Sequence, residues 1–186
     1  MLSPTGQTQD PGRKLLDGFE RGATRQLAET LKRNLEDQID TRIILTHNAG
    51  ETINQEQKAS FANRLNIDLY ISLTIYNDDA LDIHPYFYKN ELFSPSVDNR
   101  LTFYPIKKAY LKSAKKIESL IQKKLFPHKY HSMFKIIKPI GLPLKSLEGI
   151  TAPAFEFEIS IKKFVDILTY EHVLSDVIRN MINEIR

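Results

Sequence analysis

The spacing of apolar residues along the chain predicts helices and strands in alternation. Over residues 19–36 apolar side chains recur every four positions with charged side chains between them, which is typical of an amphipathic helix. Over residues 69–77 the apolar residues form a nearly continuous run, which favours a central strand covered on both faces. The first stretch thus has one apolar face and the second has two.

Other stretches continue this alternation. The further predicted helices are residues 54–65, residues 106–125 and a last helix with an apolar stripe at Val173, Val177, Met181 and Ile185. Thr169 can cap the last helix. The further predicted strands are residues 42–46, 83–88 and 153–160. Pro85 places one of them at a sheet edge or at a bulge. The remaining predictions are irregular segments at residues 1–18, 89–102 and 126–143, and a helical turn at 144–149.

Strands that alternate with helices at this spacing predict an α/β fold. We expect a single domain over residues 1–186, with a twisted, mostly parallel or mixed sheet of five to six strands and helices on both faces. The length of 186 residues suffices for one core. An apolar fraction of 41% and a charged fraction of 26% are ordinary for a globular domain and fit this expectation.

Composition excludes several classes of site. The chain has no cysteine, which rules out disulfides, thiolate metal ligands and a thiol nucleophile. No apolar run approaches the roughly 18 residues that a membrane-spanning helix needs. The N-terminal sequence MLSPTGQTQDPG lacks the basic and apolar regions of a signal peptide.

Positive charge is concentrated in residues 104–145, which hold eleven lysines and one acidic residue, whereas the whole chain carries only +3. Such a segment attracts an anionic partner, or it forms a solvated helix face. It lacks the interleaved aromatic residues of nucleic-acid-binding modules, so we expect no nucleic-acid partner.

Five segments, in order along almost the whole chain, resemble motifs of the zinc-dependent N-acetylmuramoyl-L-alanine amidases, the cell-wall amidases of type 3. The segments are SPTGQTQDPG at 3–12, GFER at 18–21, IILT at 43–46, AN with DLYISLTIYN at 62–77, and PAFEFE at 153–158. They are similar to the family's D-P-G-H-G-G-x-D-P-G, its glycine before Glu-Lys, V-x-L-T-R, A-N with A-D-L-F-I-S-I-H-A-N, and P-A-V-L-V-E.

The resemblance implies a role for individual positions. Glu20 falls on the family's glutamate zinc ligand, and Glu158 falls on its catalytic acid/base. Gly6 and Thr74 stand where the two zinc histidines are expected, and Tyr76 replaces an asparagine. The family also has a strand directly before its first motif, whereas this chain starts almost inside that motif. We therefore expect a domain excised from a longer protein.

The missing histidines change the expected chemistry. Amidase chemistry of this type needs a cation held by two imidazoles and one carboxylate, with an open position for water. A glutamate then carries the proton to the leaving amine. With glycine and threonine at the two histidine positions, we expect no bound zinc, no other cofactor and no amidase activity.

Two other ligand sets stay open. In the first, a histidine elsewhere in the chain replaces a missing ligand, and zinc remains the cofactor. The candidates are His47 and His84, each of which lies at a turn or at a strand end. Glu156 and Glu158 lie two apart on one strand and share a face, so with Glu20 they can form an all-oxygen site suited to magnesium or calcium. Glu156 can equally pair with a lysine. A shifted alignment restores nothing, because His172 lies deep in the last helix.

Three functions follow from these observations. The first is a non-catalytic, amidase-like module of the bacterial cell envelope, periplasmic or extracellular, that binds peptidoglycan or an envelope protein. Tyr76 and its aromatic neighbours at 86–88 either stack on sugar rings there or belong to the strand core. The second is an active N-acetylmuramoyl-L-alanine amidase with relocated ligands or another metal. The third is a cytoplasmic α/β domain for an anionic ligand, although no glycine-rich phosphate loop follows a strand.

Overall fold

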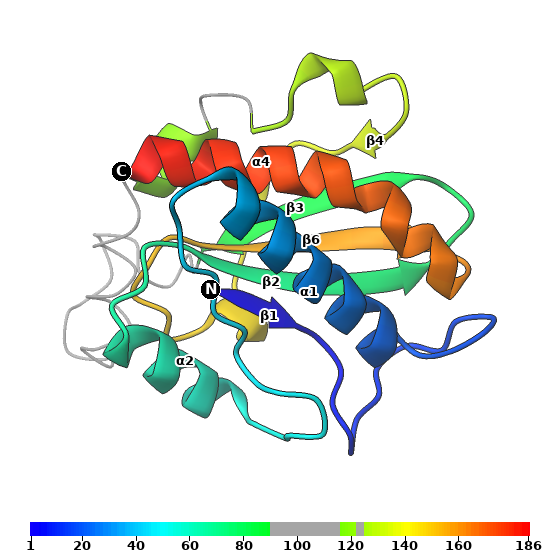
Figure 1. Ribbon diagram of the computed structural model, residues 1–186, viewed down its shortest axis with the longest axis horizontal. Helices are drawn as coiled ribbons and strands as arrows, with labels where there is room; N and C mark the ends of the chain where they lie inside the picture. The colour runs from blue at the N-terminus through cyan, green and yellow to red at the C-terminus, as the bar shows by residue number, and fades with distance from the viewer. Residues whose placement is uncertain (90–115, 122–124) are drawn as a thin grey trace.

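The computed structural model describes residues 1–89, 116–121 and 125–186, and these build one six-stranded sheet (Figure 1). The strands are β1 (Leu2–Pro4), β2 (Tyr70–Asn77), β3 (Asp82–Tyr88), β4 (Lys135–Ile136), β5 (Ile140–Leu142) and β6 (Ala154–Ile161). Their order is β1-β2-β6-β3-β4, with β5 also paired to β3. β1, β2 and β6 are mutually parallel, β3 runs antiparallel to β6, and β4 and β5 are parallel to β3. The predicted α/β fold with a mixed sheet of five to six strands is confirmed.

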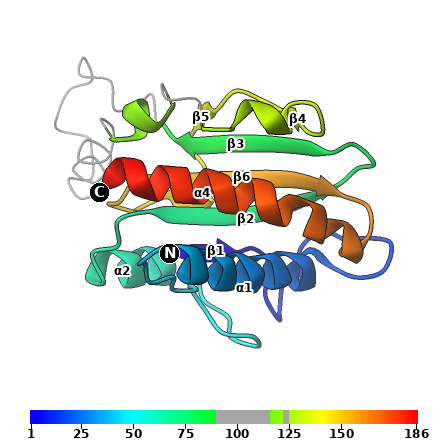
Figure 2. The same cartoon turned by 45° about the horizontal axis from the view of Figure 1, so that its top comes forward.

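Helices cover both faces of this sheet. α1 (Glu20–Gln38) and α4 (Glu171–Ile185) lie side by side over one face, as Figures 1 and 2 show. α2 (Gln55–Arg64) packs on the other face with the 3-10 helix η3 (Lys145–Leu147). The remaining short helices are η2 (His128–Tyr130) and η4 (Phe164–Tyr170). No helix in the described ranges is long and apolar enough to cross a membrane.

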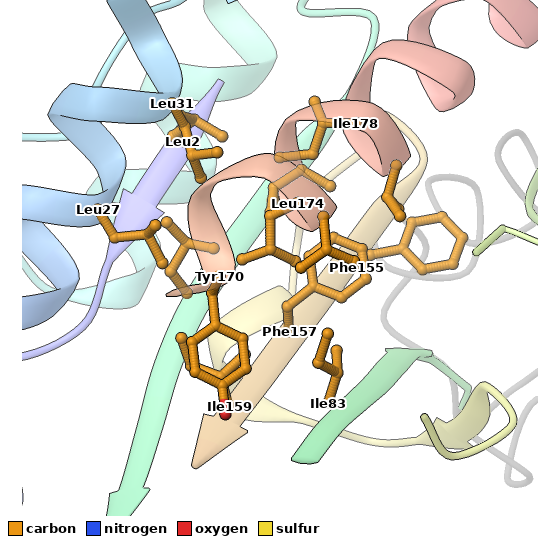
Figure 3. Close-up of a cluster of buried hydrophobic side chains, with 14 of the residues drawn as sticks. Leu2, Leu27, Leu31, Ile83, Phe155, Phe157, Ile159, Tyr170, Leu174 and Ile178 are labelled. Atoms are coloured by element: carbon orange, nitrogen blue, oxygen red, sulfur yellow. The ribbon is translucent and has the colours of Figure 1, made fainter. Parts of the chain in front are cut away.

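The main core lies between the sheet and the pair α1 and α4 (Figure 3). Because successive strand residues point to opposite faces, alternate residues of β2 and β6 enter this core. They are Ile71, Leu73, Ile75, Phe155, Phe157, Ile159 and Ile161, all at most 1% exposed. The predicted stripe of α1, from Ala23 to Leu35, packs against them. The residues between them face the other side of the sheet, where the apolar part packs under α2.

The first and third predicted segments fold differently from the expectation. Residues 2–4, which are predicted to be part of a loop, form β1, and this strand is parallel to β2. The predicted strand at 42–46 is only a bridge, in which Leu2 N donates to Ile44 O and Thr46 N donates to Leu2 O. Within this segment only Leu45 pairs with β1, at Leu2, so the contact stays a single bridge.

Two further differences lie in the C-terminal half. The segment 126–143, predicted irregular, contains β4 and β5. In the first half, Pro85 lies in β3, which is not an edge strand as a whole; Pro85 itself pairs only with Phe157 of β6 and falls, on its other side, between the residues paired with β4 and those paired with β5. Thr169 does not cap α4, which starts after Tyr170 at the end of η4. Residues 116–121 of the predicted helix 106–125 are helical; its other residues lie largely outside the described ranges, as does the predicted loop 89–102.

Candidate functional site

Two rows of polar side chains lie on the sheet face opposite α1 and α4. Thr74 of β2, Glu158 of β6 and His84 of β3 are register partners and form the first row. The second row consists of Ser72, Glu156 and Tyr86. The first row lies just past the middle of β2 and β6, and the second row lies in the first half of both strands.

Glu20, at the first position of α1, is surrounded by hydrogen-bond donors. Its Oε1 accepts bonds from Thr5 Oγ1 at 2.5 Å, Thr74 Oγ1 at 2.7 Å and Ile75 N at 3.1 Å. Its Oε2 accepts a bond from the backbone N of Arg13 at 3.0 Å. The side chain is only 5% exposed, so these four donors replace water around the carboxylate. Glu20 thereby ties the loop before α1 to β2.

Arg13 connects this loop to Glu158. Its Nη1 donates to Ile75 O and lies 2.7 Å from Glu158 Oε1. The other carboxylate oxygen of Glu158 accepts a bond from Tyr86 OH at 3.2 Å. Partial burial disfavours the charged form of Arg13. The pKa of the guanidinium is nevertheless raised, because Glu158 accepts a hydrogen bond from it and because Glu158 and Glu20 are negatively charged. No sequence pattern pointed to Arg13, which lies in a loop predicted to be irregular.

His84 lies beside Glu158 in register, but its ring nitrogens face other groups. Nε2 is 3.8 Å from Asp82 Oδ2, and Nδ1 is 3.5 Å from Tyr86 OH. Tyr76 OH donates to the same Asp82 oxygen at 3.1 Å, and burial together with this carboxylate raises the pKa of Tyr76. Of the two histidines considered as relocated ligands, His84 is therefore the one near Glu158. Asp82 was missed because it begins a strand whose polar positions carry no motif.

Glu156, the middle residue of the second polar row, is buried beside η3. Burial raises the pKa of its carboxyl group; bonds from Ser146 and Ser72 oppose the shift, and the neighbouring carboxylates reinforce it. The negative charge of Glu156 also acts on Lys58 of α2. Burial lowers the pKa of this lysine, and the charge of Glu156 opposes that change. Lys58 is thus the lysine whose charge acts on Glu156.

Replacing Glu156 by glutamine is expected to stabilise the protein at pH 8. A carboxyl group with a raised pKa in the folded state stabilises the fold below its unfolded-state pKa and loses that contribution as the pH rises through the folded-state pKa. Glu156→Gln removes this loss. Urea unfolding at pH 8 and pH 4 measures the effect. At pH 8 the variant is expected to have a higher free energy of unfolding than the unmodified protein, and at pH 4 the difference between the two is expected to be smaller. Glu148→Gln, at an exposed position, is the matched control, and an unchanged or lower stability of Glu156→Gln at pH 8 contradicts the prediction.

His47 lies in a different pocket. Its Nδ1 is 2.9 Å from Thr46 Oγ1, and its carbonyl oxygen accepts a bond from Arg25. Burial, and then nearby positive charge, lowers the pKa of the ring. His47 lines a pocket of about 420 Å³ together with Gly6 and Arg21. The topology separates this pocket from the polar rows, because residues 43–46 flank β1 whereas Glu158 lies two strands away.

Gly6 leaves no room for a side chain. Its φ of +78° is in the left-handed region that favours glycine. A Cβ atom there would lie 2.8 Å from Cα and 2.9 Å from N of Arg21, which is backbone that cannot move aside without shifting α1. Among the described residues, no group of three or more histidine, aspartate or glutamate side chains is arranged to hold a metal ion.

Comparison with known proteins identifies the fold. No protein-family model matches the chain, and no curated protein matches its sequence. Among solved structures, it is similar to the catalytic domain of CwlV, an N-acetylmuramoyl-L-alanine amidase from Bacillus (Paenibacillus) polymyxa var. colistinus, with a TM-score of 0.68 and 11% identity over 98% of this chain and 94% of that one. It is also similar to the N-acetylmuramoyl-L-alanine amidase from Clostridium difficile 630, with a TM-score of 0.64 and 17% identity over 98% of this chain and 92% of that one.

A third similar structure is the CwlD amidase from Clostridioides difficile in complex with the GerS lipoprotein, with a TM-score of 0.59 and 13% identity over 99% of this chain and 95% of that one. These identities are low, but the alignments span nearly the whole of both chains in each case. The chain therefore shares the fold of N-acetylmuramoyl-L-alanine amidases over almost its whole length.

Proposed function

We propose that this chain is an amidase-like module of the bacterial cell envelope that binds peptidoglycan without cleaving it. The shared fold supports the link to peptidoglycan, because its structural neighbours are amidases of N-acetylmuramoyl-L-alanine. The residues at the amidase positions support the loss of cleavage. A binding module needs shape and hydrogen-bonding groups rather than a metal, and the same fold can serve either purpose.

The observation that carries this proposal is the environment of Glu20. A carboxylate that serves as a zinc ligand needs a lone pair directed at the metal and two imidazoles beside it. Here the carboxylate accepts four hydrogen bonds, one of them from Thr74, at a histidine position. Gly6, at the other histidine position, cannot carry a side chain. These residues do not fit a zinc site.

The state of Glu158 supports the same conclusion. An acid/base catalyst must exchange a proton with the reacting groups at neutral pH. Glu158 instead lies in an ion pair with Arg13 and accepts a further bond from Tyr86, so both of its carboxylate oxygens are already occupied by contacts within the chain. We infer that it orders the site rather than transferring protons.

A second candidate function is an active amidase that uses His84 as a relocated ligand. Its support is the register, which places His84 next to Glu158. In addition, the buried atoms His84 Nε2 and Asp82 Oδ1 have no hydrogen-bond partner in the described part of the chain. This candidate requires stoichiometric metal, which the non-catalytic proposal excludes.

The proposed partners are peptidoglycan first and an envelope protein second. The complex of the CwlD amidase with the GerS lipoprotein supports the second, since there an amidase of this fold assembles with a protein. The lysine-rich segment 104–145 would add attraction to an anionic polymer. Residues 104–115 and 122–124 of that segment lie outside the described ranges, so this contribution stays a prediction.

Metal analysis combined with a peptidoglycan assay tests the proposal. We expect the protein, after exposure to excess zinc and dialysis, to retain far less than one zinc per chain, to sediment with insoluble peptidoglycan and to release no peptide from it. An active amidase of this fold is the positive control, and His84→Ala is the matched variant. Stoichiometric zinc that His84→Ala abolishes would establish the second candidate instead. Failure to sediment with peptidoglycan would overturn the proposed ligand.

A further inference from the structure

Arg13 contacts two acidic residues of the site, Glu20 through its backbone and Glu158 through its side chain. Its backbone N donates to Glu20 Oε2 at 3.0 Å, and its side-chain Nη1 lies 2.7 Å from Glu158 Oε1. The resemblance assigns these two carboxylates to the metal ligand and to the acid/base. We propose that the Arg13 guanidinium takes the place of the metal ion, as a cation built into the chain that keeps divalent metals out of the site.

The loop around Arg13 is fixed by backbone contacts that position the guanidinium. Glu20 N donates to Arg13 O at 2.9 Å, so residues 13 and 20 exchange bonds in both directions. Arg21 N donates to Pro11 O at 3.0 Å. Gly12 packs so closely on Glu20 that a Cβ atom at residue 12 would lie 2.6 Å from its carboxylate. The loop cannot move away from Glu20 without breaking this set of contacts.

Charge balance explains why a cation is needed at this point. Glu20, Glu156 and Glu158 interact electrostatically, and the burial of Glu156 makes their shared negative charge costly. The charge of Arg13 acts on all three carboxylates, and its guanidinium is the only ion-pair partner of Glu158 in the described part of the chain. Without Arg13, oxygen ligands of this kind would attract a hard divalent cation.

An ordinary surface ion pair would have a different consequence. Arg13 has a side-chain exposure of 49%, so its pair with Glu158 alone contributes little to stability. Loss of such a pair would lower stability slightly and leave metal affinity unchanged. Loss of a cation that replaces a metal would raise the affinity of the site for divalent ions. Metal affinity therefore separates the two roles.

The test uses manganese ions, whose unpaired electrons broaden the NMR signals of nearby amides. The full chain and its Arg13→Met variant are titrated with MnCl₂, and backbone amide intensities are followed. We expect the signals of Thr74, Ile75 and Glu158 to broaden in Arg13→Met at concentrations about tenfold lower than in the unmodified protein, since a unit charge a few ångströms from a divalent ion changes its binding by roughly that factor. Arg13→Gln is a second neutral variant, should Arg13→Met fold poorly.

Three controls isolate the position of the charge. Arg13→Lys keeps a cation and is expected to respond as the unmodified protein does. Arg21→Met removes the same charge from an exposed neighbour and is also expected to give no gain. Adding Glu158→Gln to Arg13→Met should abolish the gain. The inference is overturned if neither Arg13→Met nor Arg13→Gln gains affinity over the unmodified protein. That outcome leaves the proposed function intact, because the zinc content of the unmodified protein decides the latter.

Discussion

Replacement of Glu20 by alanine is expected to lower the free energy of unfolding by about 3 kcal/mol, because several buried donors lose their acceptor together. The hydroxyls of Thr5 and Thr74 and the backbone N–H groups of Arg13 and Ile75 all donate to this one carboxylate. Water can satisfy only part of them in the space that the side chain leaves. Equilibrium urea unfolding followed by circular dichroism measures the loss.

Two further variants show whether the effect comes from these bonds. Glu20→Gln keeps an acceptor for the Oε1 donors but turns an amide group toward Arg13 N, so an intermediate loss of about 1–2 kcal/mol is expected. Glu29→Ala removes an exposed carboxylate of the same helix that pairs with Arg25, and a loss of at most about 0.5 kcal/mol is expected. If Glu20→Ala unfolds with the same free energy as Glu29→Ala, the carboxylate is not a structural centre.

The sequence pattern predicted those elements that are long and buried. α1, β2 and β6 each carry enough consecutive buried positions for a period to be visible, and they were predicted within about two residues at either end. β1, β4 and β5 have only two or three residues, too few to show a period. Their existence depends on pairing with β2 and β3, which is a property of the folded chain rather than of the local sequence.

The candidate site was predictable only in part for a similar reason. The resemblance placed Glu20 and Glu158, and the structure brings both into contact with Arg13. An arginine in an irregular loop has no pattern that tells which carboxylate it will meet. His47 and His84 also looked equivalent, since each lies near a strand end. The strand order β1-β2-β6-β3 separates them: His84 is on the strand beside Glu158, and His47 is on the far side of β1.

The second large loss of stability is expected from substitution of Phe157, because the side chains of β6 alternate between the two faces of the sheet. Phe157 and Glu158 are neighbours in the chain but lie on opposite faces of the sheet. Phe157 lies in the main core (Figure 3), where it is 0% exposed. Its ring packs edge-on against Phe126 at a centroid distance of 6.0 Å. Phe157→Ala is expected to lower the free energy of unfolding by about 3–5 kcal/mol, because it removes a large buried ring and leaves a cavity.

The same denaturation experiment on Phe157→Leu and Glu158→Gln tests the reasoning. Leucine refills much of the space, so its loss is expected to be well below that of alanine, at about 1–2 kcal/mol. Glu158→Gln removes a half-exposed ion pair from the polar face, and a change within about 1 kcal/mol is expected. A loss for Glu158→Gln as large as that for Phe157→Ala would contradict the division of β6 into an apolar face that stabilises the fold and a polar face that contributes little. With the division intact, the apolar face of β6 stabilises the fold, and its polar face is free to differ from that of a metal-dependent amidase without loss of structure.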